Sequence, residues 1–314
     1  MHEPVTLYIL INMQSMIYDS IESAVKGCFG PDVTITKTSY VGGGDINDAS
    51  CLELSSGKRV FVKSNTLANS AFFDAEEAGL RAIASTDTVR TPVLLAKGRD
   101  EVKKKSFLMM DMIESAHPLP DRWEVFGRQL AAMHRADTSA FTCCGRFGFL
   151  SDNFIGASPQ INSCRDTWLS FFRECRLEPQ IRMASRYFGD DVLAKVIRFL
   201  DKLDEILIEP EYPSLLHGDM WSGNIMVGDD GRMMLIDPAV YVGHAEADLA
   251  MTELFGRLPG AFYKAYDEEA HIAAGYEQRR EIYNLYHLLN HLNLFGSSYL
   301  GSVLGIIRKI RKYS

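Results

Sequence analysis

The chain has 314 residues, of which 46% are hydrophobic and 24% are charged, so it is long enough to bury a sizeable core and to form two lobes. Its formal net charge is −8 and its basic residues are scattered, which argues against nucleic acid as a partner. No apolar run reaches the length of about 18 residues that a membrane span needs, and the six cysteines form no C-x-x-C pair, so the sequence favours a cytoplasmic protein with free thiols and no zinc site.

The first part of the chain is predicted to be rich in strands. Residues 1–13 are expected to be a disordered extension, because a helical pattern begins only near Gln14. Apolar residues with high strand propensity, separated by glycine-containing turns, follow. They predict strands at 33–41, 49–54 and 59–63.

Beyond residue 64 the apolar residues mostly recur at helical spacing. A helix is predicted over 70–85, strands over 93–98 and 106–113, and from Asp121 onward a helical pattern with one hairpin. The further helix candidates are 122–136, 165–186, 190–208, 245–257, 260–270 and 278–312, the last with a break near 296–301.

This change of pattern predicts an α+β fold with two lobes. The smaller, β-rich lobe is expected over 14–112 and the larger, mainly helical lobe over 113–314, with a short connection near 111–114.

One hairpin carries polar residues at both of its ends, within LLHGDMWSGNIMVGDDGRMMLIDPA (215–239). If 225–228 pairs with 232–236, Asn224 and Asp237 become neighbours, and an amide oxygen beside a carboxylate suits Mg²⁺. Asp219 lies five residues before Asn224, which reproduces the H-x-D-x-x-x-x-N spacing of kinase catalytic loops. Asp and Asn are also common in ordinary turns. The combination of the three motifs HGD, WSGN and IDP nevertheless favours the kinase interpretation.

A kinase also needs a clamp for the phosphates of its nucleotide, and Lys63 at the end of RVFVK is the candidate. The helical wheel of 70–85 places Glu76 on the apolar face and Glu77 at its edge. Because a buried carboxylate needs a cation, the sequence predicts an ion pair between Lys63 and Glu76. The alternative is that Glu76 bends out to solvent.

Gly42, Gly43 and Gly44 lie between two predicted strands and would let the backbone approach phosphate closely, although three glycines also form ordinary turns. The chain has no Walker A, G-x-S-x-G, H-E-x-x-H or G-x-G-x-x-G motif. His287 and His291 are four residues apart without a carboxylate partner, so they are interpreted as packed or hydrogen-bonded histidines.

Together these segments resemble the fructosamine kinase (ketosamine-3-kinase) family over about residues 30–300. The segments that carry the resemblance are GGGDIN (42–47), FVKSN (61–65), FLMMDMI (107–113), RFGFLSDNFIG and PQINS (146–163), WLSFFRECRLEPQ (168–180), LLHGDMWSGN (215–224), IDPAVYVGHAEADLAM (236–251) and YNLYHLLNHLNLFG (283–296). The resemblance implies a bilobal protein-kinase-like fold, related to aminoglycoside phosphotransferases, that uses ATP and Mg²⁺. It further implies transfer to the O3 hydroxyl of a ketosamine, such as a fructosamine or ribulosamine, free or on glycated lysine, with deglycation as the result.

The resemblance also assigns roles on the catalytic loop. Asp219 would accept or orient the proton of the acceptor hydroxyl, and His217 would hold the backbone of the loop. Asn224 and Asp237 would hold Mg²⁺ against the phosphates. Trp221 would stack on the sugar, with core packing as its alternative.

Two further sets complete the expected site. Asp111, Met112, Ile113 and Glu114 would offer backbone groups to adenine, and Asp248 would brace the HGD loop. Position 218 is Gly where protein kinases have Arg, and ten residues separate Asp237 from Asp248, which leaves no room for a long regulatory segment. The sequence therefore predicts a kinase that needs no activating phosphorylation.

Two alternatives stay open at this point. The chain could phosphorylate another small acceptor, such as an aminoglycoside, choline or a free sugar, or it could bind nucleotide without turnover. The sequence leaves the physiological amine and the oligomeric state undefined.

Overall fold

The computed structural model describes residues 17–42, 47–142 and 145–310. The predicted extension 1–13 and the glycines Gly43 and Gly44 lie outside these described residues. The chain divides into two compact units. Unit 1 comprises Met1–Arg122 and Ile225–Pro238, and unit 2 comprises Trp123–Asn224 and Ala239–Ser314.

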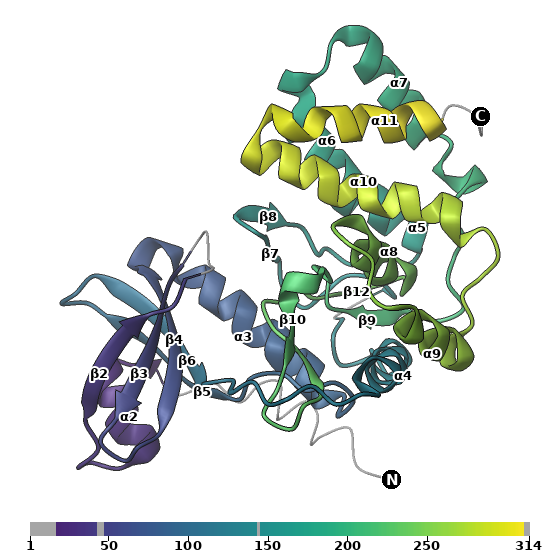
Figure 1. Cartoon of the computed structure of the whole chain (residues 1–314). Helices are drawn as coiled ribbons and strands as arrows, with labels where there is room; N and C mark the ends of the chain where they lie inside the picture. The colour runs from purple at the N-terminus through teal and green to yellow at the C-terminus, as the bar shows by residue number, and fades with distance from the viewer. Residues whose placement is uncertain (1–16, 43–46, 143–144, 311–314) are drawn as a thin grey trace. The chain divides into compact units, whose positions relative to one another are not determined.

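Unit 1 is built on a six-stranded sheet with the strand order β1-β5-β6-β4-β3-β2 (Figure 1). The pairing of β1 with β5 is parallel, and the other neighbouring strands pair antiparallel. The strands are β1 (Ile17–Tyr18), β2 (Ile35–Tyr40), β3 (Asp48–Leu54), β4 (Arg59–Thr66), β5 (Leu94–Asp100) and β6 (Lys105–Asp111). The strands predicted over 33–63, 93–98 and 106–113 are therefore confirmed, with ends that differ by a few residues.

Each face of this sheet packs against one helix, because neighbouring side chains of a strand point to opposite faces. In β6, Phe107 and Met109 join the core beside α2 (Ile21–Phe29), whereas Leu108 and Met110 join the core that contains residues of α3 (Ser70–Ser85). The predicted helix over 70–85 is confirmed at both ends. Ser20 caps α2 by accepting a 3.1 Å hydrogen bond from the amide of Ser23.

The predicted hairpin forms and belongs to unit 1. Strands β10 (Ile225–Val227) and β11 (Met233–Leu235) pair antiparallel, with Ile225 opposite Leu235. The turn between them is tied to the segment after β6, because Gly228 and Gly231 accept 3.1 Å hydrogen bonds from the amides of Ala116 and Leu119. These backbone contacts explain why the hairpin groups with unit 1, although the sequence assigns it to the larger lobe.

Unit 2 is mainly helical. Its helices are α4 (Arg122–His134), α5 (Trp168–Phe171), α6 (Glu178–Ala184), α7 (Asp190–Leu200), α8 (Glu246–Leu254), α9 (Gly260–Ala270), α10 (Tyr276–Phe295) and α11 (Leu300–Ile310), with a π-helical turn, η2 (Phe172–Leu177), between α5 and α6. The predicted break near 296–301 is confirmed: α10 ends at Phe295 and is capped by Gly296, whose φ of +87° favours glycine. At the centre of the core, Trp168 is fully buried among the rings of Phe171, Phe172 and Tyr283.

Four short strands of unit 2 were not predicted. Strands β7 (Asn153–Ile155) and β8 (Ser158–Gln160) form one hairpin, and β9 (Ser214–Leu216) pairs with β12 (Tyr241–Gly243). Each has three residues, which is too short for alternation to be recognised in a sequence. The β9–β12 pair positions the HGD segment, because that segment begins where β9 ends.

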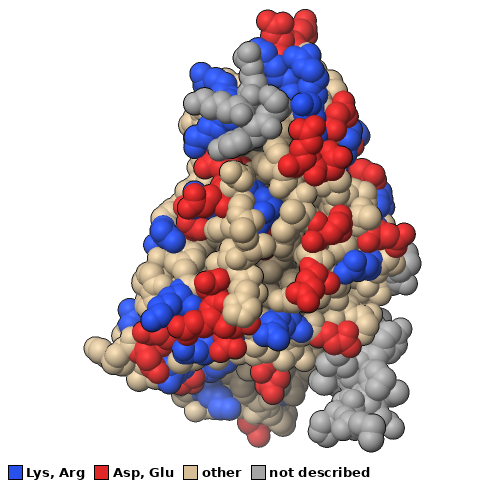
Figure 2. Space-filling view, turned by 90° about the vertical axis from the view of Figure 1, so that its right-hand side faces the viewer, with Lys and Arg blue, Asp and Glu red and all other residues tan. Residues whose placement is uncertain are grey.

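Figure 2 shows basic and acidic side chains interspersed over the visible face, without a broad basic patch. Among the described residues, no helix is both long and apolar enough to cross a membrane. The four cysteines in the described ranges, Cys28, Cys51, Cys164 and Cys175, are free thiols, in agreement with the prediction.

Two buried histidines of unit 2 predict acid sensitivity. Burial lowers the pKa of His244 and that of His287 from 6.5 to about 3, so both rings are neutral in the folded state. A lowered folded-state pKa gives stability that is present above pH 6.5 and is lost as the pH falls toward 3, because the unfolded chain takes up protons first. We expect each histidine to remove about 1.5 kcal/mol of unfolding free energy between pH 6.5 and pH 5.

Urea unfolding at a series of pH values measures this loss. The His287→Gln variant should show a weaker pH dependence than the wild type, because one of the two protons is no longer taken up. Equal slopes for the two proteins below pH 6.5 would contradict the assignment.

Candidate active site

The strand alternation of unit 1 brings Lys63 to the face of the sheet that α3 covers. Lys63 lies opposite Leu108 in the β4–β6 register and therefore points to the same side as Leu108. There its Nζ donates a 2.6 Å hydrogen bond to Oε1 of Glu76, so the predicted ion pair is present. The alternative, in which Glu76 bends out to solvent, is wrong, since its side chain is only 11% exposed.

Lys63 also pairs with Asp237, at the end of the hairpin in unit 1. Burial alone would lower the pKa of Lys63, but the charges of Glu76 and Asp237 outweigh burial and raise the pKa above its usual value. Lys63 is therefore a fixed cation at neutral pH, and it lies between one buried and one half-exposed carboxylate.

The prediction that Glu77 lies at the edge of the apolar face is wrong. Glu77 is buried, with 7% of its surface exposed. Its charge is balanced by the 2.6 Å contact with Lys97 Nζ and the 2.9 Å contact with Arg81 Nη2. Lys97 comes from β5, which is distant in sequence, so a helical wheel could not reveal this partner.

Asp237 has a strained backbone. Its φ of +54° lies in the left-handed region, which residues other than glycine seldom adopt. Asp and Asn tolerate this conformation better than other residues, and such strain concentrates at functional sites. The conformation lets the chain leave β11 while the carboxylate of Asp237 reaches Lys63.

In unit 2, the HGD loop is held by the buried carboxylate of Asp248 in α8. Its two oxygens accept hydrogen bonds from the backbone amides of His217 (2.7 Å) and Gly218 (2.9 Å). Nδ1 of His217 in turn accepts a 3.2 Å hydrogen bond from the amide of Asp219. The side chains of His217 and Asp248 thus fix the backbone that carries Asp219.

Two further residues support Asp248, and neither was predicted. Nε2 of His134 lies 3.2 Å from Asp248 Oδ2, and Nδ1 of His134 lies 2.8 Å from the hydroxyl of Tyr266. Burial would raise the pKa of Asp248, but the hydrogen bonds and charges around it, with His134 first among them, lower the pKa. The sequence did offer one indication of this contact. His134 is a lone histidine on the apolar face of α4, and a buried ring nitrogen needs a polar partner.

Gly218 is required by the space around the loop. Its φ is +81°, and a Cβ atom at this position would lie 2.0 Å from the carbonyl oxygen of Ala239. An arginine, which protein kinases have at the corresponding position, therefore cannot be accommodated here.

Asp219 and Asn224 contact each other within unit 2. Nδ2 of Asn224 donates to the backbone oxygen of Asp219 at 2.9 Å and to Oδ2 of Asp219 at 3.0 Å. Trp221, in the same loop, is 40% exposed. Core packing, the alternative role for Trp221, therefore does not describe this side chain.

The connection segment is joined to the sheet of unit 1. Asp111 donates its amide to the carbonyl of Val93 at 3.0 Å, and Glu114 accepts a 2.7 Å hydrogen bond from Nε of Arg59. Met112 and Ile113, between them, are half-buried. Gly42 is exposed, with nothing within 4 Å of the position of a Cβ atom.

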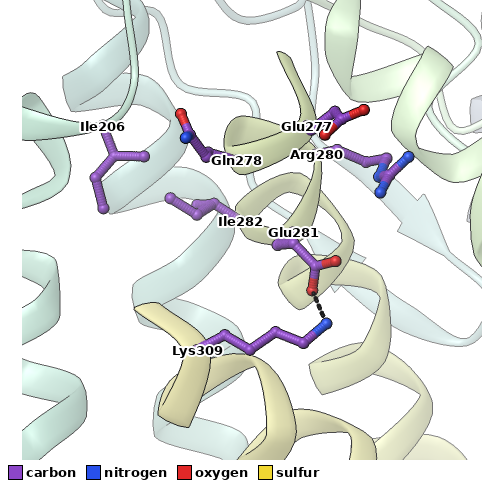
Figure 3. Close-up of a pocket in the computed structure, with 7 residues that line it drawn as sticks. All are labelled: Ile206, Glu277, Gln278, Arg280, Glu281, Ile282 and Lys309. Atoms are coloured by element: carbon purple, nitrogen blue, oxygen red, sulfur yellow. Dashed lines mark hydrogen bonds and ion pairs between the residues drawn. The ribbon is translucent and has the colours of Figure 1, made fainter. Parts of the chain in front are cut away.

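Figure 3 shows a pocket of unit 2 that contains none of the predicted site residues. It has a volume of about 280 Å³ and lies beside the start of α10, with Glu281 paired to Lys309 at 3.1 Å. His287 and His291 lie on α10 as packed residues: His287 is buried, and His291 Nδ1 lies 2.8 Å from the carbonyl of His287. Within the described ranges, no cluster of three His, Cys, Asp or Glu side chains could hold a metal ion.

Comparisons with known proteins identify the family. A family model described as fructosamine kinase matches residues 17–313. A probable ketoamine kinase from Synechocystis is 39% identical over 90% of this chain and 92% of its own length. A chloroplastic protein-ribulosamine 3-kinase from Arabidopsis thaliana is 38% identical over 88% of this chain and 83% of its own length.

Solved structures agree with this result. A proposed fructosamine-3-kinase from Thermobifida fusca has 32% identity and a TM-score of 0.79, and the match covers 94% of this chain and 99% of that one. A macrolide 2′-phosphotransferase type I has 14% identity and a TM-score of 0.59 over 95% of this chain and 99% of that one, a likeness that shows the fold alone. The chain therefore belongs to the fructosamine kinase family, a family of ATP-dependent phosphotransferases with the bilobal α+β fold of protein kinases.

Proposed function

We propose that this protein transfers the γ-phosphoryl group of ATP to the O3 hydroxyl of a ketosamine, a fructosamine or a ribulosamine, free or on glycated lysine. The observation that carries the proposal is the arrangement of the HGD loop, in which two buried carboxylate oxygens of Asp248 fix the backbone of a half-exposed Asp219. The names of the relatives, ketoamine kinase and ribulosamine 3-kinase, support the substrate class. The free thiols support a reducing compartment such as the cytoplasm.

In this proposal, unit 1 holds the nucleotide. Lys63, kept charged and oriented by Glu76, contacts the phosphates in place of its present bond to Asp237. The backbone N–H groups of Gly42, Gly43 and Gly44 would be donors to the phosphates. The backbone of 111–114 binds adenine.

Asn224 and Asp237 would hold Mg²⁺, and their oxygen atoms are of the hard type that this ion prefers. The amide nitrogen of Asn224 is used by Asp219, which leaves its amide oxygen as the group for a cation. When bound, Mg²⁺ would neutralise charge on the phosphates, as it does in other kinases.

The transfer itself requires a base and a positioned acceptor. Asp219 accepts the proton of the O3 hydroxyl as the bond from O3 to phosphorus forms and the bond from phosphorus to the ADP oxygen breaks. Trp221, which is 40% exposed, stacks on the apolar face of the sugar. The phosphate on O3 is a good leaving group on the carbon next to the keto carbon. Loss of a proton from the amine-bearing carbon gives an enol that expels the phosphate, and water then hydrolyses the resulting imine and releases the amine. Deglycation is the expected outcome.

Mass spectrometry of glycated lysine incubated with the enzyme and ATP–Mg²⁺ tests this function. Lysine glycated with glucose or with ribose should gain one phosphate group, and unglycated lysine should gain none. An aminoglycoside, choline and a free sugar serve as competing acceptors. Phosphorylation of one of these, with no transfer to either ketosamine, would overturn the substrate assignment, and ATP binding without any transfer would favour a non-catalytic protein.

A further inference from the structure

The segment WLSFFRECRLEPQ (168–180) is part of the family resemblance, yet the proposed mechanism uses none of it. It forms α5, the π-helical turn η2 and the start of α6, all within unit 2. π-Helical turns are rare and often occur at functional sites. The segment also carries Arg176, which is fully buried.

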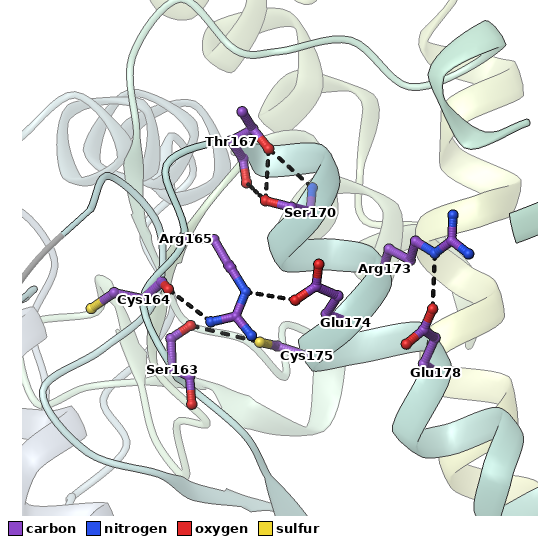
Figure 4. Close-up of polar contacts among 9 residues, drawn as sticks. All are labelled: Ser163, Cys164, Arg165, Thr167, Ser170, Arg173, Glu174, Cys175 and Glu178. Carbon is purple, nitrogen blue, oxygen red and sulfur yellow. Dashed lines mark hydrogen bonds and ion pairs between the residues drawn. The ribbon is translucent and has the colours of Figure 1, made fainter. Parts of the chain in front are cut away.

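Arg176 differs from Arg165 and Arg173, its neighbours in sequence, in having no acidic partner. Figure 4 shows Arg165 paired with Glu174 and Arg173 paired with Glu178, at 2.7 and 2.8 Å. Among the described residues, no carboxylate forms an ion pair with Arg176. A buried cation without a paired anion is costly, so its position requires an explanation.

Neutral oxygens and aromatic rings surround this guanidinium. Nη1 donates to the carbonyls of Ile161 (2.5 Å) and Cys175 (2.9 Å), and Nη2 donates to Oδ1 of Asn162 (2.7 Å). Nε is buried without a partner. The guanidinium carbon lies 3.9 Å from the ring centroid of Tyr241 and 4.6 Å from that of Phe171, within the range of cation–π attraction.

Tyr241 connects Arg176 to the HGD loop. It lies in β12 opposite Leu216, the residue before His217. A Cβ atom on Gly218 would lie 3.3 Å from Cε1 of Tyr241, so the ring packs close to the loop backbone. The ring therefore limits the space available to the backbone of Gly218, the residue before Asp219.

A second ring, Tyr286 of α10, has its centroid 5.7 Å from the guanidinium carbon of Arg176. Burial, with Asp219 among the charges that act in the same direction, raises the pKa of Tyr286, while the charge of Arg176 lowers it. The hydroxyl of Tyr286 donates a 2.6 Å hydrogen bond to Oε1 of Gln160, and Nε2 of Gln160 donates to the carbonyl of Ala239 at 3.0 Å. Ala239 in turn donates its amide to the carbonyl of His217 at 2.8 Å.

We propose that Arg176 is a positioning residue for the catalytic loop: its guanidinium, held without a counter-ion against Tyr241 and near Tyr286, fixes the backbone at Gly218 and Asp219. It touches neither substrate nor nucleotide and acts through the two rings. This inference rests on the role of Asp219 proposed above.

The test compares Arg176→Met with a matched variant, Arg173→Met. Both remove an arginine from the same π-helical turn, but Arg173 is 37% exposed and pairs with Glu178 and Asp201. Arg176→Met should lower kcat by about 100-fold, the loss expected for a displacement of about 1 Å at the reacting group. The KM for ATP should change far less than kcat, because Lys63 and the segment 111–114, which are proposed to contact the nucleotide, lie in unit 1 outside this loop. Arg173→Met should keep the wild-type kcat.

Hydrogen exchange of the backbone amides of residues 215–224 gives a second readout that needs no acceptor. We expect faster exchange in this segment for Arg176→Met, and unchanged exchange for Arg173→Met. If the wild-type protein fails to phosphorylate ketosamines, the proposed function fails, while the exchange data still decide on Arg176.

A folded Arg176→Met protein with wild-type kcat, or with wild-type exchange over 215–224, would overturn the positioning role. If Arg176→Met does not fold, Arg176→Gln, which keeps polar contacts to the carbonyls, takes its place. If neither variant folds while Arg173→Met does, Arg176 serves only the stability of the core, and the positioning role is overturned as well.

Discussion

The Asp219→Asn variant should fold and bind ATP normally but transfer phosphate with a kcat lowered by about 10²- to 10⁴-fold, the contribution of a positioned general base. The substitution removes the group that accepts the proton of the acceptor hydroxyl. It leaves the loop in place, because Asp248 holds the amides of His217 and Gly218 rather than the side chain of Asp219.

Steady-state kinetics with glycated lysine measure this effect. The matched control is Asp229→Asn, which removes another carboxylate, one in the hairpin turn that is 67% exposed and pairs with Arg90. It should keep the wild-type kcat. A kcat within about fivefold of the wild type in Asp219→Asn would remove Asp219 from the proton transfer, since general bases contribute far more.

The Lys63→Met variant should lose about 10²- to 10³-fold in kcat, because one fixed positive group at the phosphates would be missing. It should also be less stable, because Glu76 would remain buried without its cation. The loss of stability and the loss of activity therefore have to be separated.

The double variant Lys63→Met with Glu76→Gln separates them. Removing both charges should restore much of the unfolding free energy, whereas activity should stay low. Lys97→Met is the matched control, since Lys97 pairs with Glu77 on the same helix and Arg81 still balances that carboxylate. Recovery of activity in the double variant would contradict a role of Lys63 at the phosphates.

Local periodicity predicted the parts of the site that depend on one element and its neighbour. The helical wheel of α3, together with the place of Lys63 at the end of RVFVK, was enough to pair Lys63 with Glu76. The same reasoning misplaced Glu77, because its partner Lys97 arrives from another strand. Burial of a charged group depends on every element packed around it, and a single helix shows only one of them.

Most of the residues that hold the HGD loop could not be predicted from the sequence. Asp248 was predicted beside this loop from the family resemblance, but His134 and Tyr266 come from α4 and α9. Arg176 could not be recognised from its neighbours in sequence, because Arg165 and Arg173 close to it form ordinary ion pairs. Strands β9 and β12, which frame the loop, have three residues each and give no periodic signal.

The left-handed backbone of Asp237 restricts how this position can vary. A β-branched or bulky residue at φ +54° would add strain on the order of 1 kcal/mol or more, whereas Asn and Gly fit the same conformation. Most substitutions of Asp237 would therefore disturb the backbone at the end of the hairpin as well as the chemistry of this position. Aspartate satisfies both demands at once, and Asn removes the charge while it keeps the backbone conformation and nearly the same side-chain size.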